Sequence, residues 1–430
     1  MNFCFSLRSV VIVLLSICYC SSAYGESFSS LLQFTYENNK EILAARKNLK
    51  AQYQNLNQLE SRLSPSLTAN FSANKLWDFE SDDDSDGFSA DLSADYTIFD
   101  GNFTNNNVVA EEARIKSLEN ELDSLEQKVI LSATIAYLDV LKDQRLVELS
   151  ERNVVVLKQQ LEATDSRFEL GELTKTDVSQ ATAALAAASS TLSARKGSLI
   201  RSESIFEMII GKPAEVLEKD IRLPDLPNSL AEAKETALIF NSNYKSVLFL
   251  EEMAKAKYRA SKALKSPSVV LSSTLTAGES AADNSFSSFR LRVMGSVPIY
   301  SAGKNDSAIK EAEILLEMAS HRSKLALLKL TQSVVTSWSD LKVVNSVIDA
   351  RSRQVDANNL AFQGVREEAR LGMRTTLEVL NAEQSLMNAK TELAIAESDR
   401  LAAGFSLLEA IGKLDPETLK LQVAVIKSEE

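Results

Sequence analysis

The stretch whose residue types most clearly suit metal chemistry is Asp82-x-Asp84-x-Asp86-Gly87. Alternating carboxylates before a glycine match the first half of a calcium-binding loop, in which oxygen ligands wrap a hard cation. The bidentate glutamate that such a loop needs later is missing, because Ser93 occupies its place. An acidic, solvated hairpin loop explains these residues better, so they remain a weak calcium candidate.

Catalytic chemistry finds little support elsewhere in the chain. His321 is the only histidine, and the three cysteines all lie within the first 20 residues, which argues against a zinc site. The sequence contains no nucleophile–base pair, phosphate-binding loop or dinucleotide motif. A net charge of −12 argues against a nucleic acid partner. We therefore predict that the chain is not an enzyme and needs no cofactor.

The N-terminus, residues 1–25, has the pattern of a secretory signal peptide. Arg8 precedes an apolar run at residues 10–17, and Ala23-Tyr24-Gly25 provides a small-x-small cleavage site. A membrane anchor and a lipidated Cys18 or Cys20 are the alternatives. However, the apolar run is short for about 30 Å of hydrocarbon, and a large residue precedes each cysteine. The mature chain then contains no cysteine, as suits export to the periplasm or outer membrane without disulfides.

The mature chain repeats itself at an offset of 201 residues. Leu170-Gly171 matches Leu371-Gly372, and Ile98-Phe99 matches Ile299-Tyr300. A register kept over more than a hundred residues indicates two copies of one unit. We assign them to residues 26–228, which end in a linker, and 229–430, which end in a tail. Each copy is expected to contain helices, a β-hairpin (about 66–99 and 268–300) and a long helical hairpin with its tip at 171–174 or 372–375.

Long rods dominate the helical pattern. Residues 106–170 contain neither Gly nor Pro, and about 65 residues at ~1.5 Å each give a rod near 100 Å. In the second copy, one apolar seam runs through Val379 and Leu386 and another through Leu380 and Met387. Two adjacent seams suit a helix with a neighbour on each side, as in a ring of helices. A plain antiparallel helical bundle is the alternative.

The two hairpin segments alternate between apolar and polar residues. In residues 88–98 the apolar positions are Phe88, Ala90, Leu92, Ala94, Tyr96 and Ile98, with polar residues between them. This pattern suits a barrel wall between lipid and a wet lumen, although a half-exposed sheet of a soluble protein also produces it. Beyond the signal segment no run of 18 apolar residues occurs, so a membrane crossing would require a closed β-barrel.

This order of elements resembles the TolC-like outer-membrane efflux family over essentially the whole mature chain. The motifs that carry the resemblance are Ile98-Phe99-Asp100-Gly101 and Pro298-Ile299-Tyr300-Ser301-Ala302-Gly303 at the strand-to-helix junctions, and Leu170-Gly171-x-x-Thr174-x-Thr176-Asp177-Val178 and Leu371-Gly372-x-Arg374-Thr375-Thr376-Leu377-Glu378-Val379-Leu380 at the tips. The resemblance implies a mainly α protein with a β-barrel portion. Four strands per chain and three chains would close a twelve-stranded outer-membrane barrel, continued by a helical tunnel across the periplasm.

The resemblance also implies function and partners. A homotrimer in outer-membrane lipid would be the passive exit duct of a tripartite efflux or type I secretion system. A periplasmic adaptor and an inner-membrane pump would provide the trigger and the energy. The rival hypothesis is a non-channel periplasmic or surface coiled-coil protein, in which the apolar strand faces would point to a small core instead of to lipid.

The same resemblance implies a gate at the periplasmic tips. In the family, polar contacts between the two hairpins hold the tip closed, and acidic residues constrict it. The matching positions here are Thr176, Asp177, Arg374 and Glu378, whereas Asn381 replaces a second constricting acid and Ala369 an aromatic latch residue. An arginine can bridge carboxylates by charge-assisted bonds, and loss of such bonds would release a latch. The alternative is that these are ordinary solvated residues at helix starts.

Apolar residues at the tip turns suggest a docking surface. Gly171 and Gly372 suit tight helix-to-helix turns because glycine tolerates positive φ. We predict that the adaptor contacts Leu170, Leu173, Leu371 and Met373, and that Gly171 and Gly372 belong to the same docking surface.

Overall fold

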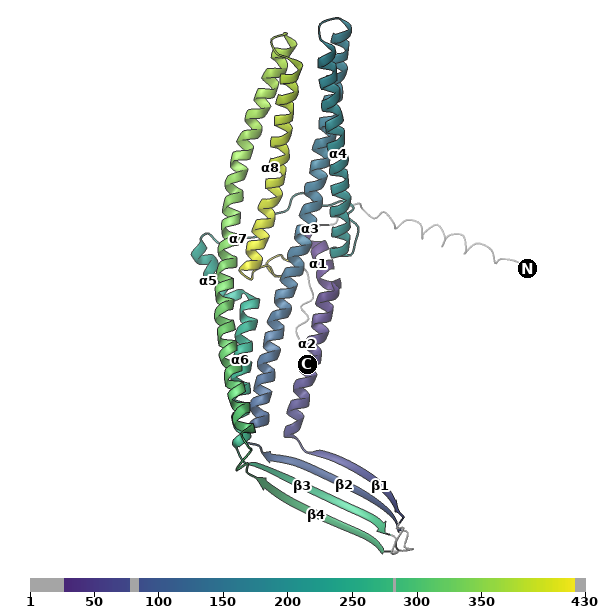
Figure 1. Cartoon of the computed structure of the whole chain (residues 1–430), viewed down its shortest axis with the longest axis vertical. Helices are drawn as coiled ribbons and strands as arrows, with labels where there is room; N and C mark the ends of the chain where they lie inside the picture. The colour runs from purple at the N-terminus through teal and green to yellow at the C-terminus, as the bar shows by residue number, and fades with distance from the viewer. Residues whose placement is uncertain (1–26, 78–84, 281–283, 422–430) are drawn as a thin grey trace, which may run out of the picture.

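The computed structural model describes residues 27–77, 85–280 and 284–421. The expected signal peptide, residues 1–25, lies outside these ranges, as do Asp82 and Asp84. The molecule is a long rod with a sheet at one end and the tips of two helical hairpins at the other (Figure 1). It is mainly helical with four strands, which confirms the predicted fold class.

The element order runs twice along the chain. The first half contains α1 (Phe28–Asn38), α2 (Lys40–Glu60), the 3-10 turn η1 (Ser61–Leu63), β1 (Ser66–Leu76), β2 (Ser85–Phe99), α3 (Phe103–Glu169) and α4 (Lys175–Ile210). The second contains α5 (Leu230–Phe240), α6 (Ser242–Lys262), η2 (Ala263–Lys265), β3 (Ser268–Ser280), β4 (Asn284–Ser296), α7 (Lys304–Arg370) and α8 (Thr376–Ala410). Helices α3 and α7 have the same length of 67 residues, shifted by 201 positions, whereas α2 and α6 are shifted by 202.

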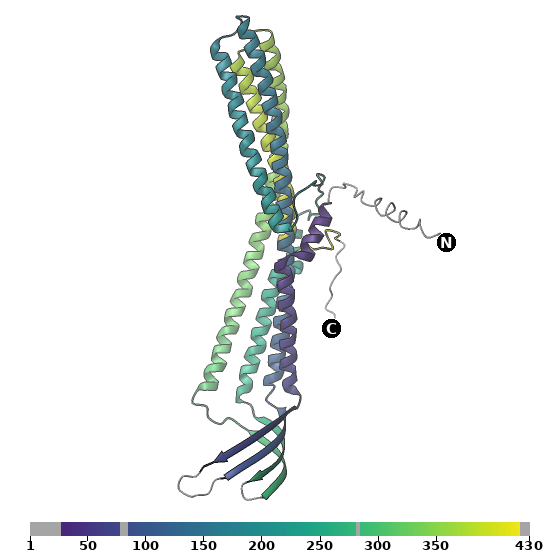
Figure 2. The same ribbon diagram turned by 90° about the vertical axis from the view of Figure 1, so that its right-hand side faces the viewer.

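Local sequence explains where these helices begin and end. Asn39 and Asn241 separate each short helix from the next one, and their side chains accept hydrogen bonds from the new first turn. Helices α3 and α4 pack as one antiparallel hairpin, and α7 and α8 as another (Figure 2). Within the described ranges, none of the helices combines the length and apolar character needed to cross a membrane.

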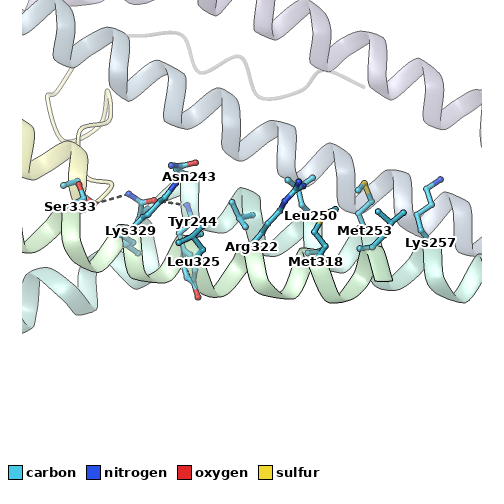
Figure 3. A pocket seen from close by; sticks show the side chains of 18 of the residues that line it. Asn243, Tyr244, Leu250, Met253, Lys257, Met318, Arg322, Leu325, Lys329 and Ser333 are labelled. Atoms are coloured by element: carbon cyan, nitrogen blue, oxygen red, sulfur yellow. Dashed lines mark hydrogen bonds between the residues drawn. The ribbon is translucent and has the colours of Figure 1, made fainter. Parts of the chain in front are cut away.

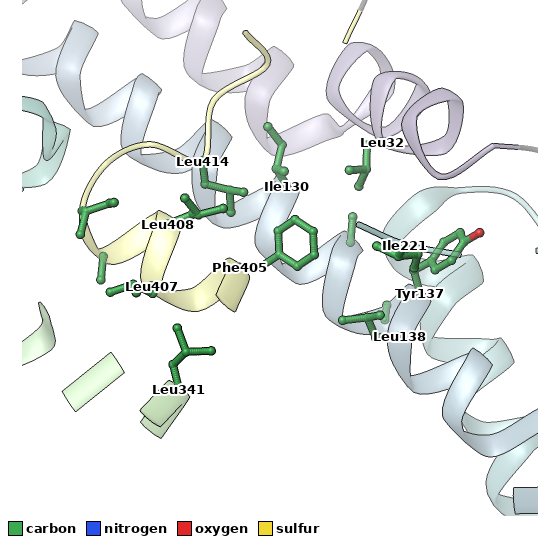
Figure 4. Close-up of a cluster of buried hydrophobic side chains, with 14 of the residues drawn as sticks. Leu32, Ile130, Tyr137, Leu138, Ile221, Leu341, Phe405, Leu407, Leu408 and Leu414 are labelled. Atoms are coloured by element: carbon green, nitrogen blue, oxygen red, sulfur yellow. The ribbon is translucent and has the colours of Figure 1, made fainter. Parts of the chain in front are cut away.

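The main hydrophobic core (Figure 4) lies midway along the rod, where α1 packs on the long helices (Figure 1). The linker after α4 and the tail after α8 also pack there, and Tyr137, Phe206 and Phe405 are fully buried. The Tyr137 hydroxyl donates to the Glu218 carbonyl oxygen (2.9 Å), and burial raises the pKa of Tyr137 to about 12. Trp338 packs against the same cluster, as its place on an apolar helical stripe predicts.

The four strands form one antiparallel sheet in the order β1-β2-β3-β4. The strands curve together (Figure 1), and β1 and β4 are its two edges. On one face the apolar side chains stay open to solvent: Phe71 is 75% and Phe289 69% exposed. The residues that alternate with them form the other face, called the polar face, which is mostly polar but includes Val270, Phe286 and Met294.

Strand β4 ends earlier than the alternating pattern predicts. The pattern continues to Ile299 and Tyr300, but the strand stops at Ser296. Pro298 has no N–H for a ladder bond, which explains the early end. Ile299 and Tyr300 are left 95% and 87% exposed.

Candidate functional site

Each helical hairpin turns at a glycine with left-handed backbone geometry. Gly171 has φ 78° and Gly372 has φ 77°. In the first tip the Gly171 N–H donates to the Phe168 carbonyl oxygen (2.9 Å), and the next N–H donates to that of Arg167 (2.9 Å). The second tip repeats both bonds. This pair of bonds is a Schellman motif, which closes α3 and α7 and requires positive φ at the glycine.

A capping box starts each returning helix. The carboxylate of Asp177 accepts the backbone N–H of Thr174 (2.9 Å) and its hydroxyl (2.6 Å), and the Asp177 N–H donates back to the Thr174 hydroxyl oxygen (3.3 Å). Thr375 and Glu378 repeat the arrangement at the start of α8. Each box satisfies two backbone N–H groups that would otherwise be unpaired at the start of its helix.

Arg374 joins both helices of the second hairpin. Its Nε donates to Glu368 Oε2 on α7 (2.7 Å), and its Nη1 donates to Glu378 Oε1 on α8 (2.7 Å). The Thr375 backbone N–H, the Arg374 guanidinium and the Thr375 hydroxyl lower the pKa of Glu378 to about 2. The two carboxylates raise the pKa of Arg374 further above its ordinary value. The pair of Arg374 and Glu378 therefore stays charged at neutral pH and in mildly acidic solution.

Asp177 provides a polar contact between the two hairpins. The Thr174 hydroxyl, the Thr174 backbone N–H and the Thr376 hydroxyl lower its pKa. Thr376 opens α8 and is only 7% exposed, so the starts of α4 and α8 lie close together. Arg374 makes no ion pair with Asp177, because both of its carboxylate partners belong to its own hairpin.

The other predicted site residues lie at the surface. Thr176 and Asn381 are exposed, and Leu173 is half-buried. Leu170 and Leu371 are 75% and 76% exposed at the turns, and Met373 is exposed beside them. In the calcium candidate, the described Asp86 pairs with Lys75 (Nζ–Oδ1 3.6 Å). No cluster of potential metal ligands occurs in the described part of the chain.

Sequence reasoning named Thr174 and Thr375 only as motif residues and gave no role in the site to them or to Glu368. The two threonines had a readable signal, since Thr-x-x-Asp and Thr-x-x-Glu before a helix are capping-box sequences. The partnership between Glu368 and Arg374 spans a turn, and only the turn geometry brings them together.

Sequence reasoning also missed a buried carboxyl, that of Glu383 on α8. It lies between the two apolar seams of this helix and is 7% exposed. Nearby, Leu157, Ala188 and Leu380 pack together from three helices. Burial raises the pKa of Glu383 to about 7, and the positive charge of Arg366 on α7 partly opposes the rise. Glu383 is thus the one group in the tip region of the described chain whose raised pKa lies near neutral pH.

With this geometry established, the chain can be compared with known proteins. A family model described as "Outer membrane efflux protein" matches residues 31–211 and 240–413. The chain is 28% identical to outer membrane efflux protein BepC of Brucella suis, covering 95% of this chain and 90% of the relative. It is 24% identical to alkaline protease secretion protein AprF of Pseudomonas aeruginosa, covering 92% and 86%. The solved structure of the outer membrane protein VceC from Vibrio cholerae superposes with a TM-score of 0.81 at 19% identity, covering 89% and 95%.

Glu383 makes the stability of the tip region depend on pH. Since its folded pKa is raised from 4.5 to about 7, its stabilising contribution is complete below about pH 4.5 and disappears as the pH rises through about 7. The loss should amount to about 2 kcal/mol in the partly buried site. We expect amide hydrogen exchange in the first turns of α8, corrected for intrinsic rates, to show weaker protection at pH 8 than at pH 5.5.

The Glu383→Gln variant should keep the same protection at both pH values. Glu397→Gln, an exposed change on the same helix, is the matched control and should behave like the unaltered protein. Equal protection of the unaltered chain at pH 5.5 and 8 would contradict the assignment.

Proposed function

The chain belongs to the outer membrane efflux protein family, and from that premise we propose how three copies of it assemble, close and open as one export duct. Members of this family are passive channels and not enzymes, and the protein is accordingly an outer-membrane exit duct that extends into the periplasm. One observation carries the assembly proposal. The sheet has an apolar face without cover and two unpaired edges, which a single chain cannot satisfy.

The internal repeat suggests the register in which copies join. Within the chain β2 pairs with β3, with Leu92 opposite Leu275. The equivalents of these two residues are Val293 on β4 and Ala73 on β1. If β4 of one copy pairs with β1 of the next as β2 pairs with β3, Val293 lies opposite Ala73 of the next copy.

One residue pair supports this register independently. It places Gly295 opposite Phe71 of the next copy, both on the apolar face. An added Cβ at Gly295 would meet nothing within 4 Å, and Phe71 is among the most exposed aromatic side chains. An aromatic ring opposite a glycine covers its bare backbone, a recurrent arrangement in sheets.

The helices support the same arrangement. A groove of about 650 Å³ with a mainly apolar lining opens between α6 and α7 (Figure 3). Its α7 wall includes Met318 and Arg322, the equivalents of Ser117 and Glu121, whose side chains hydrogen bond Ser246 of α6. By the same equivalence, α2 of the next copy would pack along α7 at this groove.

The charges on these helices are complementary. Inside the chain, Lys116 on α3 lies over the Phe249 ring of α6 (6.0 Å). The equivalent positions between copies are Glu317 on α7 and Lys47 on α2, both exposed in the single chain. Opposite charges at this point favour the copy-to-copy contact.

Cysteine cross-linking tests both the assembly and the register. The mature chain has no cysteine of its own, so Ala73→Cys combined with Val293→Cys should form disulfides between copies and give a cross-linked trimer. The detergent-extracted trimer should conduct ions in a planar bilayer. The matched control, Ala69→Cys with Val293→Cys, uses the same face of β1 about 13 Å further along and should stay uncross-linked.

The two readouts separate the possible failures. Cross-linking of the control pair in place of the first pair would overturn the register but leave the trimer. A species that needs no detergent and does not conduct would overturn the channel and favour the coiled-coil rival.

The tip contacts suggest how the duct stays closed. The Arg374 bridge holds α7 and α8 in one hairpin geometry, and the contact between Asp177 and Thr376 joins this hairpin to the other. Thr176 and Asn381 flank these groups at the surface. Loss of either contact would let the tips separate, which is the movement that a gate requires.

Arg374→Ser and Asp177→Ala should each raise the closed-state conductance several-fold. The control is Arg370→Ser, which removes an exposed pair with Glu367 on α7 alone and should leave conductance unchanged. Because the pKa of Glu378 is about 2, the low conductance of the unaltered channel should persist at pH 4. Unchanged conductance in both tip variants would remove the latch from these residues.

The apolar residues at the turns form the tip surface, defined as the exposed Leu170, Leu371 and Met373 and the half-buried Leu173, with Gly171 and Gly372 between them. An apolar surface at the periplasmic end suits a periplasmic adaptor, which would in turn recruit an inner-membrane pump. The relatives' names include both an efflux protein and a protease secretion protein, so the cargo class stays open between small molecules and polypeptides.

Charged substitutions test the tip surface. Leu170→Glu and Leu371→Glu together should abolish export by cells that carry the cognate pump, while the cross-linked trimer and its conductance remain normal. Glu172→Gln, a polar change at the same turn, is the control and should export normally. Normal export by the double variant would exclude these residues as a docking surface.

A further inference from the structure

The polar face of the sheet carries two acidic and two basic residues on separate strands. Asp91 and Asp95 lie on β2, and Arg290 and Arg292 lie on β4. The residues of this face on β1 and β3 are uncharged: they include Ser66, Thr68, Asn70, Ser72 and Asn74 on β1, and Ser268, Val270, Ser272, Thr274, Thr276 and Gly278 on β3. Thus an uncharged strand separates the acidic strand from the basic one.

The register fixes how far the charges lie apart. Asp95 pairs with Ser272, and Ser272 pairs with Arg292, so this acid and this base share one row across β3. Two strand spacings separate them by about 10 Å, well beyond an ion pair. In agreement, none of the four charged residues takes part in an ion pair within the described ranges.

Closure of the barrel does not bring the arginines near a carboxylate. When β4 pairs with β1 of the next copy, their polar side chains must lie on the same side of the sheet. A shift of the register by one residue would move the apolar side chains of one strand to the polar side. The polar face of β1 is uncharged along its described length. In every register that keeps the two polar faces on the same side of the sheet, Arg290 and Arg292 therefore have uncharged residues on both neighbouring strands.

We propose that the barrel lumen carries alternating acidic and basic columns, and that Arg290 and Arg292 form the contact through which anionic groups of the cargo pass. The proposal rests on the proposed function, since it needs the polar face to enclose a lumen. Around three copies the order is uncharged, acidic, uncharged, basic, repeated three times.

The separation of the columns has a physical consequence. At 0.1 M salt the screening length is about 10 Å, equal to the spacing between columns, so each column keeps its own local potential. An arginine pair flanked by Ser288, Ser272 and Thr274 offers several donors to a carboxylate, sulfate or phosphate group. The carboxylates of the acidic column can likewise accept hydrogen bonds from ammonium groups. The described residues of the polar face carry no net charge, which lets cargo of either sign pass.

Local thiol chemistry measures these potentials without interference from the tips. Ser288→Cys places a thiol beside the arginines, and Ser93→Cys places one between Asp91 and Asp95. We expect an anionic methanethiosulfonate reagent to modify the thiol at position 288 at least about three-fold faster than a cationic one, with the opposite preference at position 93. Arg290→Gln with Arg292→Gln should abolish the preference at position 288 and leave that at position 93 unchanged.

The control is Leu291→Cys, on the apolar face between the two arginines, whose thiol should react slowly with both reagents. In 1 M salt the screening length falls to about 3 Å, and both preferences should shrink. A conducting trimer in which the anionic and the cationic reagent react at equal rates, both at position 93 and at position 288, would overturn this proposal alone. A trimer that does not conduct would overturn the proposed function beneath it.

Discussion

An apolar sheet face with two open edges is the constraint on which the whole structure depends. Strands β1 and β4 each leave a row of backbone donors and acceptors unpaired, and the apolar side chains between them have no cover in the chain. Exposure of the apolar face to water costs free energy, and so does exposure of the unpaired backbone groups at the edges to lipid. Only closure of the sheet with further copies, in contact with lipid, relieves both penalties. The long helices follow from the same closure, because they continue each strand pair away from the membrane.

The fold was largely predictable because its rules are local. The absence of Gly and Pro predicts α3, the repeat at an offset of 201 carries that prediction to α7, and alternation predicts the strands. The end of β4 at Ser296 was not predicted, since the apolar pattern continues to Tyr300 while Pro298 removes a backbone donor. The order and register of the strands could not be predicted from the sequence and are known only from the structure. The number of copies was predicted only from the family resemblance. At the tips, the roles of Asp177 and Glu378 in capping boxes were readable, whereas the burial of Glu383 depends on packing between hairpins.

The two halves share an architecture but differ chemically where their helices meet. Glu126 on α3 accepts hydrogen bonds from Arg46 on α2 (2.8 Å) and from the Tyr36 hydroxyl on α1 (2.9 Å). Burial and the negative charge of Glu126 raise the pKa of Tyr36 to about 12. The equivalent positions in the second half are Leu248 on α6 and Leu327 on α7, which are both apolar. Charge and hydrogen bonds thus join the helices at this point in the first half, and apolar residues occupy it in the second.

Because the core lies midway along the rod, a small rotation at the core produces a larger displacement at the hairpin tips. Helix α4 runs from the core residues Phe206 and Ile210 to the capping box at Thr174, a length of about 54 Å for its 36 residues. A rotation of only about 5° at the core would move the tip by roughly 5 Å over that length. A small change in angle at the core is thus amplified into a displacement of the hairpin tip.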